Sequence, residues 1–278
     1  MALRELFTIP VPREPAIPNG GTVSVSQPEP QVYLVTITCA PDNRLTSGSC
    51  GAIIEALDRL AALTGSGTSE GLRLKPGVVV TTSGIPKFYS NGLDLSSAFS
   101  DPTFLPSKLY RLFSTLLTYP MPTVALMNGH AFAGGLMLAM HHDYRVMNPS
   151  KGYACINELE FGVPLKAAMS SIFRLKLTAA VYRQLVLEAH RFGGPDALQN
   201  GIVDATGDLQ TVLVKLIGEK KLKEKAEPRG KVKGMGYGVL GMLRSEMYRE
   251  SLDLLSAEGH QREEQRERRM MGVVTAKL

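Results

Sequence analysis

Residues 122–143 read PTVALMNGHAFAGGLMLAMHHD, and this stretch decides the fold. Its first part, 124–127, is a short apolar run that ends at an Asn-Gly pair. Gly134 and Gly135 then open a second apolar segment, which we expect to be helical. A strand followed by a helix that begins at two glycines directs backbone N–H groups into the space beyond the helix N-terminus. Enzymes place such donors where negative charge develops during a reaction.

The composition is that of an ordinary globular chain. The 278 residues are 44% hydrophobic and 21% charged, enough for one domain with a large core and at most an appendage. No apolar run approaches the roughly 20 residues of a membrane span, and residues 1–15 contain no signal-peptide core. Cys39, Cys50 and Cys155 are scattered and form no Cys-x-x-Cys pair. They predict reduced thiols in an intracellular compartment and no metal site.

The positive charge is concentrated in one segment. The chain carries a net charge of +5, and residues 220–233 hold seven Lys or Arg and two Glu, so 7 − 2 = +5 lies there. Because the rest of the chain is balanced, we expect no nucleic-acid-binding face. The segment is either a solvated basic loop or a patch that attracts an anionic ligand such as a phosphorylated cofactor.

Hydrophobic periodicity predicts alternating strands and helices. Residues 1–30 contain six prolines, so we expect a loosely ordered lead-in with one short strand near 22–25. Further along, β-branched or apolar runs predict strands, and apolar residues at helical spacing predict helices. The main expected strands are 32–38, 77–82, 123–127 and 143–147, with shorter ones at 153–156 and 201–204, and the main expected helices are 47–63, 106–118, 134–142, 166–175, 178–189 and 237–257. This alternation indicates an α/β core with a helical packing or assembly layer in the last third.

Four segments resemble one family. They are PDNRLT at 41–46, SGIPKFYSNGLDL at 83–95, the stretch quoted above, and NELEFGVPL at 157–165. Each is weak alone, but in this order and spacing they identify the chain as a member of the enoyl-CoA hydratase/isomerase (crotonase) superfamily over residues 30–260. The NGLDL loop, the HDY that follows the expected helix and the NE turn are most similar to peroxisomal-type Δ3,Δ2-enoyl-CoA isomerases. The resemblance implies a spiral of stacked ββα turns, with a C-terminal helical layer that joins copies into a trimer or hexamer.

The resemblance also implies the catalytic groups. The backbone N–H groups of Leu93 and Gly134 take the place of the family's oxyanion hole, and Glu158 takes the place of its acid/base residue. Family hydratases carry a second glutamate three residues after the oxyanion glycine, where this chain has Met137. Glu160 is a rival base, because in an extended segment it would share a face with Glu158. The family spacing to Gly162 favours Glu158.

These residues favour isomerisation over hydration. Two N–H donors stabilise the enolate oxygen of a thioester, which makes the α-proton removable. One carboxylate can take that proton from C2 and return it to C4, whereas family hydratases use two carboxylates to handle one water. Apolar neighbours of Glu158 (Ile156, Leu159, Phe161 and Val163) are expected to desolvate it and raise its pKa.

The remaining site residues follow from position within the motifs. The expected coenzyme A contacts are Asn43, Arg44, Leu45, Lys87, Ser90 and Asn91. The expected acyl pocket is Met137, Phe132 and Tyr89, the last two of which serve core packing equally well. Asp94 is expected to cap a helix or orient its loop, and His141 and His142 to cap a helix or be solvated. No cofactor beyond the coenzyme A of the substrate is expected.

The last three residues suggest a targeting signal. Ala276-Lys277-Leu278 resembles the Ser-Lys-Leu type of peroxisomal signal, which predicts a peroxisomal import receptor as partner and the peroxisome as location, with the cytoplasm as alternative. We divide the chain into a lead-in (1–30), a crotonase-like domain (31–258, with its core at 31–205 and helical layer at 206–258) and a charged, mobile tail (259–278).

Other functions remain compatible with these motifs. The same enolate chemistry would serve a hydratase, a thioester hydrolase or an isomerase of secondary metabolism. A protein that binds acyl-CoA without turnover is the alternative from another class. The predicted base and both oxyanion positions favour the enzyme.

Overall fold

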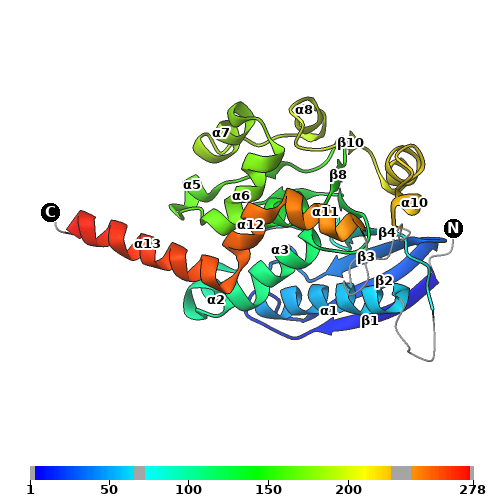
Figure 1. The fold of residues 1–278 in the computed structure, drawn as a ribbon, viewed down its shortest axis with the longest axis horizontal. Helices are drawn as coiled ribbons and strands as arrows, with labels where there is room; N and C mark the ends of the chain where they lie inside the picture. Colours follow the sequence, from blue (N-terminus) through cyan, green and yellow to red (C-terminus); the bar gives the residue numbers. More distant parts are fainter. Residues whose placement is uncertain (1–3, 66–72, 227–238, 276–278) are drawn as a thin grey trace.

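A seven-stranded sheet forms the centre of the computed structural model, which describes residues 4–65, 73–226 and 239–275 (Figure 1). Its order is β1-β2-β3-β4-β6-β8-β10. The first three strands pair antiparallel, and the others pair parallel. The bounds are β1 Arg4–Val11, β2 Gly21–Glu29, β3 Val32–Thr38, β4 Val78–Ser83, β6 Thr123–Met127, β8 Tyr144–Met147 and β10 Ala205–Thr206.

A second, parallel sheet has three short strands in the order β5-β7-β9, namely β5 Phe88–Ser90, β7 His130–Phe132 and β9 Ala154–Cys155. Each follows a strand of the large sheet: β4 leads to β5, β6 to β7, and β8 to β9. A helical segment follows each pair. The chain therefore advances by repeated ββα turns, as the resemblance implied.

Helices cover both faces of the large sheet. One face carries α1 Ser47–Thr64, α3 Tyr110–Leu117, α4 Gly134–Met140, α6 Ala167–Lys176 and α12 Arg249–Leu255, whose buried side chains join the larger core cluster. The other face carries η2 Val212–Gly218 and α10 Leu222–Ala226 over a smaller cluster. Strand alternation divides β4 between the two, because Val79 faces the larger cluster and Val78 and Val80 face the smaller.

The other helices lie at the periphery. They are α2 Leu95–Ser100, η1 Leu105–Leu109, α5 Glu158–Phe161, α7 Ala179–Leu187, α8 Gly194–Gln199, α9 Leu209–Thr211, α11 Val239–Met247 and α13 Ala257–Thr275. The helix expected at 237–257 is thus divided into α11 and α12. Within the described ranges, no helix has the length and apolar character to cross a membrane.

The expectation of a loosely ordered lead-in was wrong for residues 4–30, although the short strand expected near 22–25 is present as part of β2. β1 and β2 pair along almost their whole length and extend the large sheet. The alternation that drives this is visible in β1, where Phe7, Ile9 and Val11 are buried between more exposed residues. The prolines are tolerated because β1 is an edge strand and Pro28 lies where the pairing of β2 shifts register.

The charged tail also differs from expectation. Residues 257–275 form α13, which projects from the body of the molecule in Figure 1. Its first turns are tied to α6: Glu267 pairs with Lys166 (2.7 Å), and the Glu263 carboxylate accepts the N–H of Ala167. The sequence of this segment has no apolar stripe, so it gave no sign that a helix here would dock through polar contacts. The tripeptide Ala276-Lys277-Leu278 lies outside the described residues.

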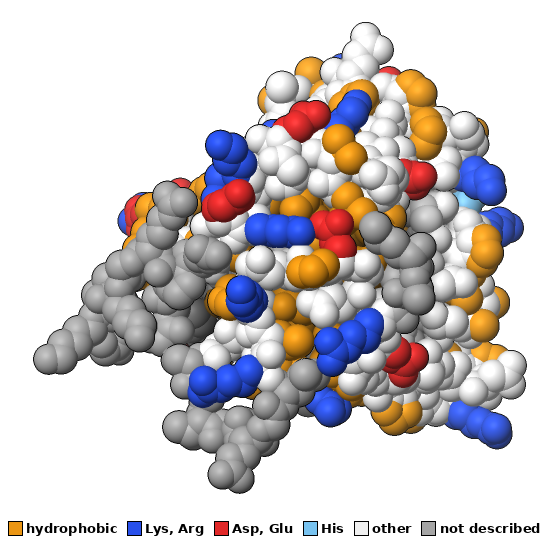
Figure 2. All heavy atoms as spheres, turned by 90° about the vertical axis from the view of Figure 1, so that its right-hand side faces the viewer, with side chains coloured by type: hydrophobic (Ala, Val, Ile, Leu, Met, Phe, Trp, Pro, Cys, Tyr) orange, Lys and Arg blue, Asp and Glu red, His pale blue; other side chains and the backbone are white. Residues whose placement is uncertain are grey.

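The basic segment is described only as far as Ala226. In that part Lys223 pairs with Glu29 (2.7 Å), and the Lys220 ammonium lies 5.6 Å from the centre of the Tyr144 ring. Figure 2 shows the side of the molecule that carries α10. On its described surface, Lys and Arg are interspersed with acidic and apolar side chains. Residues 227–233 of the segment lie outside the described residues.

Candidate active site

The two amides expected to bind an oxyanion lie side by side. A Cβ placed on Gly92 would lie 3.2 Å from the Gly134 nitrogen, and a Cβ placed on Gly134 would lie 3.3 Å from the Leu93 nitrogen. In the described part of the chain neither N–H donates to another protein group. Two adjacent, unused backbone donors are the arrangement that a developing oxyanion requires, and their role as an oxyanion hole stays a prediction.

The loop that presents Leu93 is fixed by pairing with the 41–46 turn. The N–H of Leu45 donates to the carbonyl of Gly92 (2.8 Å), and the N–H of Asp94 donates to the carbonyl of Leu45 (3.1 Å). Gly92 has φ +86°, a conformation that favours glycine. Asp94 directly precedes α2, in agreement with a capping or loop-orienting role.

The backbone that presents Gly134 is strained and tightly packed. Ala133 has φ 49° and ψ −121°, a region that non-glycine residues seldom adopt and that is common at functional sites. Its N–H donates to Cys155 (2.8 Å), and its carbonyl accepts from Met137 (3.0 Å). A Cβ on Gly135 would lie 2.3 Å from the carbonyl oxygen of Ser90. Glycine is therefore required where α4 approaches β5.

Glu158 is the first residue of α5, directly after the loop that leaves β9. Burial raises the pKa of Glu158 to about 7, and a hydrogen bond to its own backbone N–H offsets this in part. Its Oε2 atom is buried and has no hydrogen-bond partner among the described residues. The expected rise in pKa is confirmed, but its expected cause is partly wrong, because Leu159 and Phe161 are 61% and 63% exposed.

The structure separates Glu160 from Glu158. We expected an extended segment in which the two share a face, but α5 is helical, and residues two apart then point in nearly opposite directions. Glu160 is exposed, and its carboxylate accepts two hydrogen bonds from Arg191 (2.8 and 3.0 Å). Glu160 is therefore an ion-pair residue at the surface, and the structure does not support it as the rival base.

Met137 occupies the helical turn that follows Gly134. It is fully buried in α4, and its N–H donates to the Ala133 carbonyl. A thioether at this position neither accepts nor donates a proton in general acid/base catalysis. The place at which family hydratases carry their second glutamate is thus filled by an apolar side chain.

Two of the residues expected to contact coenzyme A are held inside the protein. The Asn43 amide accepts the N–H of Cys39 (2.7 Å) and donates to Ser83 (2.6 Å) and to the Tyr89 carbonyl (3.1 Å). The Ser90 hydroxyl donates to the Asn43 carbonyl (2.8 Å). Both side chains are 1% exposed. We therefore correct the expectation for these side chains, since they hold the loops together and leave no polar atom for a ligand.

The other expected coenzyme A contacts divide by exposure. Leu45 is buried, and the Asn91 amide donates to Asp42 (2.6 Å). Arg44 remains 33% exposed, donates to the carbonyl of Leu93 (3.1 Å) and pairs with Asp42 (3.2 Å). Lys87 is exposed beside the Phe88 ring. Among the six, Arg44 and Lys87 offer charges that an anionic ligand could reach.

The two aromatic residues of the expected acyl pocket also differ in exposure. Phe132 is half-buried, next to the His130 ring (4.8 Å between centroids). Tyr89 is fully buried, and its hydroxyl is 2.8 Å from that of Thr81. Tyr89 therefore serves the core, which was the alternative expectation for it.

His141 and His142 are buried, so of the two expected roles the structure supports helix capping and contradicts solvation. Each Nδ1 donates to a carbonyl of α4, from His141 to Met137 (2.7 Å) and from His142 to Leu138 (2.9 Å). Burial lowers the pKa of each to about 3. Both are therefore neutral at physiological pH and cap the helix. In the described parts of the chain, no three His, Cys, Asp or Glu side chains are grouped to hold a metal ion.

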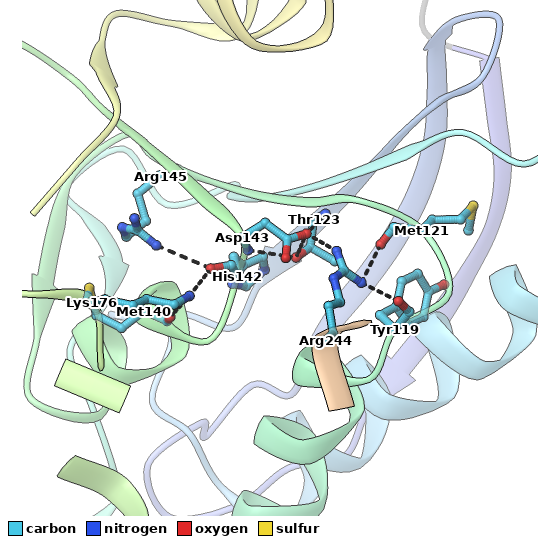
Figure 3. A network of polar contacts seen from close by, with 9 residues as sticks. All are labelled: Tyr119, Met121, Thr123, Met140, His142, Asp143, Arg145, Lys176 and Arg244. Atoms are coloured by element: carbon cyan, nitrogen blue, oxygen red, sulfur yellow. Dashed lines mark hydrogen bonds and ion pairs between the residues drawn. The ribbon is translucent and has the colours of Figure 1, made fainter. Parts of the chain in front are cut away.

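Sequence reasoning missed the cations around the end of α4 (Figure 3). The Lys176 ammonium donates to the carbonyls of Met140 (2.7 Å) and His142 (2.6 Å). Arg145 donates to the His142 carbonyl (3.2 Å) and pairs with Asp204 (3.0 Å). Arginine in the middle of a buried strand was the available signal, because a buried charge requires partners.

A third cation, Arg244, fixes the segment on the other side. It donates to the carbonyls of Tyr119 and Met121 and pairs with Asp143 (Figure 3). Asp143 in turn accepts the N–H of Thr123 (2.7 Å) at the start of β6. The network thus ties α11 to the strand that leads to the site and to the turn that leaves α4.

The two sheets, the ββα turns and the paired amides define a crotonase-type enzyme. The chain belongs to the enoyl-CoA hydratase/isomerase family, whose model matches residues 72–226. Two Arabidopsis thaliana relatives are named enoyl-CoA delta isomerase 1, peroxisomal (36% identical), and enoyl-CoA delta isomerase 2, peroxisomal (30% identical). Each match covers 63% of this chain and 72% of the relative.

Solved structures share the fold. An enoyl-CoA isomerase of Mycobacterium tuberculosis, solved in its apo form, superposes with a TM-score of 0.64 at 23% identity over 84% of this chain and 93% of its own. A family protein of Pseudomonas syringae superposes with a TM-score of 0.67 at 20% identity over 87% and 96%. The expected crotonase fold is thereby confirmed.

Proposed function

We propose that this chain converts 3-enoyl-CoA into trans-2-enoyl-CoA. The observation that carries the proposal is the carboxylate count. Glu158 is half-buried, with one buried oxygen that has no hydrogen-bond partner among the described residues and a pKa of about 7, while the second acid/base position of family hydratases holds the buried Met137. The delta isomerases among the relatives support the same reaction.

The proposed mechanism moves one proton. The Glu158 carboxylate removes a proton from C2, and the C2–H electron pair enters the thioester as a dienolate. The N–H groups of Leu93 and Gly134 donate to the enolate oxygen, each contributing roughly 3–4 kcal/mol. The protonated Glu158 then returns the proton to C4, which leaves the double bond between C2 and C3. A pKa near 7 suits a group that must both accept and donate near neutral pH.

In this proposal the substrate enters as its coenzyme A thioester and no separate cofactor takes part. Arg44 and Lys87 are the charged groups that support recognition of the phosphates. The buried thioether of Met137 keeps water from the dienolate.

A panel of substrates tests the reaction. 3-Enoyl-CoA and trans-2-enoyl-CoA are assayed side by side for isomerisation, hydration and release of free coenzyme A. We expect isomerisation to be much faster than hydration and no thioester hydrolysis. Hydration as fast as isomerisation would contradict the proposal and favour a hydratase. Binding of all thioesters with no turnover would favour a binding protein.

We further propose a place in peroxisomal β-oxidation. The support is the small–basic–Leu ending at residues 276–278 and the peroxisomal names of two relatives. A chain that lacks Ala276-Lys277-Leu278 should keep its activity and melting temperature but stay in the cytoplasm when it is the sole copy in the cell, as followed by microscopy. Peroxisomal import of that truncated chain would refute the address.

A further inference from the structure

Lys176 is a half-buried residue whose ammonium is desolvated, and the proposed mechanism has no use for this cation. It is the last residue of α6, and its ammonium donates to the carbonyls of Met140 and His142 at 2.7 and 2.6 Å (Figure 3). The same ammonium lies 5.1 Å from the centre of the Tyr248 ring. Asp204, a nearby carboxylate, is hydrogen-bonded to Arg145 instead. Among the described residues, the Lys176 ammonium therefore has carbonyl oxygens as hydrogen-bond partners and no ion-paired carboxylate.

The Lys176 ammonium lies where the C-terminal end of α4 needs hydrogen-bond donors and positive charge. The last carbonyls of a helix have no intrahelical donor and carry partial negative charge, so a cation is favourable there. Met140 is the final residue of α4, and His142 lies two residues further on. Desolvation lowers the pKa of Lys176 well below its usual range. A lysine at the surface would stabilise the helix end with a smaller desolvation cost. The desolvated position of this ammonium therefore indicates a role beyond stability.

The other end of the same helix is the proposed oxyanion donor. α4 has seven residues, all buried, from Gly134 to Met140, and seven residues of helix span about 10 Å. Because the helix has only about two turns, we expect a displacement at its C-terminus to reach the Gly134 N–H. Removal of the cation also takes away the side-chain donor to the Met140 carbonyl and leaves the His142 carbonyl with Arg145, which reduces the positive charge at the negative end of the helix.

We propose that Lys176 is a positioning residue for the oxyanion hole, which holds α4 so that the Gly134 N–H points, with that of Leu93, at the thioester oxygen. The inference rests on the proposed function. A small displacement of α4 can have a large effect on the rate, because a shift of about 1 Å far from the reacting atoms can cost on the order of a hundredfold in rate.

The test compares Lys176→Met with Lys176→Gln. Methionine keeps an unbranched stem and removes every donor. Glutamine keeps an amide donor but lacks the charge and is too short to bind both carbonyls. The direct readout is the infrared carbonyl stretch of bound octanoyl-CoA labelled with carbon-13 at C1, which has no double bond to shift or hydrate. The second readout is the division of the effect between kcat and KM for 3-enoyl-CoA.

We expect the wild-type protein to lower the carbonyl stretch on binding. In Lys176→Met that shift should be largely lost, and kcat should fall roughly tenfold to a hundredfold with little change in KM. Lys176→Gln should lie between the two in both readouts. The matched control is Leu216→Ala, which opens a cavity in the smaller core on the opposite face of the sheet and is expected to cost about 2–5 kcal/mol of stability. It should lower the melting temperature but leave the stretch and kcat at wild-type values.

The outcomes separate the two proposals. A wild-type carbonyl shift and kcat in Lys176→Met would overturn the positioning role while leaving the isomerase proposal intact. If that variant does not fold, the same result in Lys176→Gln would overturn it. If Leu216→Ala also lost the carbonyl shift and kcat, the effect of Lys176→Met would be explained by lost stability, and the positioning role would be overturned. Absence of the shift in the wild-type protein would remove the oxyanion hole itself, and the inference with it.

Discussion

At the scale of single residues, the assignment of Glu158 rests on its environment as much as on its place in a motif. Spacing to Gly162 favoured Glu158 over Glu160, but a sequence cannot show which of two neighbouring carboxylates is desolvated. In the structure one has a buried oxygen without a partner and the other has a guanidinium partner at the surface. The sequence likewise could not show whether His141 and His142 are buried or solvated. A His-His pair near a helix end is compatible with solvation or burial, and its burial depends on Phe113 stacking 4.0 Å from His141.

The two glutamates give a matched pair of variants. Glu158→Gln should lower isomerase turnover by roughly a hundredfold or more, since it removes a general base while it keeps the shape of the side chain. Glu160→Gln breaks one exposed ion pair with Arg191 and should leave turnover near the wild-type value. Steady-state assays with 3-enoyl-CoA measure both, and calorimetric titration with a saturated acyl-CoA checks that binding survives. The reverse pattern would transfer the base to Glu160.

The raised pKa of Glu158 also predicts how stability depends on pH. Its folded-state pKa, about 7, lies above its ordinary value of 4.5, so the stability linked to the neutral carboxyl is fully present below about pH 4.5 and is lost as the pH rises to about 7. Glu158→Gln stays neutral throughout. The variant should therefore match the wild type below pH 4.5 and be more stable above pH 7, by on the order of 3 kcal/mol. Denaturant unfolding across this range measures the difference, and a constant difference at all pH values would contradict the assigned pKa.

At the scale of elements, the sequence predicted best where local pattern and tertiary role agree. The apolar run 124–127 and the glycine pair at 134–135 gave β6 and α4 nearly to the residue, because nothing competes with a buried strand and a glycine-led helix. β1 was missed, and β2 was expected only as a short strand near 22–25, because six prolines outweighed the alternation of buried and exposed residues. The edge position of β1 makes its proline tolerable. α13 was missed because its docking depends on Lys166 and on a backbone N–H of α6, which are distant in sequence.

The approach of α4 to β5 gives a prediction at this scale. Gly135→Ala would place a Cβ 2.3 Å from the carbonyl oxygen of Ser90. Because that oxygen belongs to the backbone, the strand or the helix must shift, and we expect a loss of about 1–3 kcal/mol in unfolding free energy together with a fall in kcat. Gly51→Ala is the control, since its Cβ would meet only the flexible end of Lys108 at 4.0 Å. That change inside α1 should stabilise the protein by about 0.5–1 kcal/mol. Equal behaviour of the two variants would show that the contact between α4 and β5 is not tight.

At the scale of the whole molecule, the described residues include apolar side chains that remain exposed on the surface. α11 exposes Val239, Met242, Leu243 and Met247, which recur at helical spacing along one face, while Gly241 and Arg244 on the opposite face are buried. Leu243 and Met247 are 64% and 66% exposed. Solvated apolar stripes of this kind are typical of surfaces that bind a partner. They support the proposal, first implied by the resemblance, that the C-terminal layer joins copies of this chain.

Substitution within the stripe tests the assembly. We expect the wild-type protein to be a trimer or hexamer in solution, because burial of the stripe against a second copy is worth roughly 25 cal/mol for each Å² of apolar surface removed from water. Leu243→Asp places a charge in that surface and should shift the protein toward monomers, as measured by sedimentation velocity. Val214→Asp is the control, because Val214 is 50% exposed on η2, over the opposite core of the sheet, and should leave the assembly unchanged. A monomeric wild type, or a Leu243→Asp variant that assembles like it, would separate the stripe from self-association. Because Arg244 on the same helix fixes Asp143 and through it the start of β6, a monomeric Leu243→Asp variant that also loses turnover would show that assembly keeps α11, and so the site, in place.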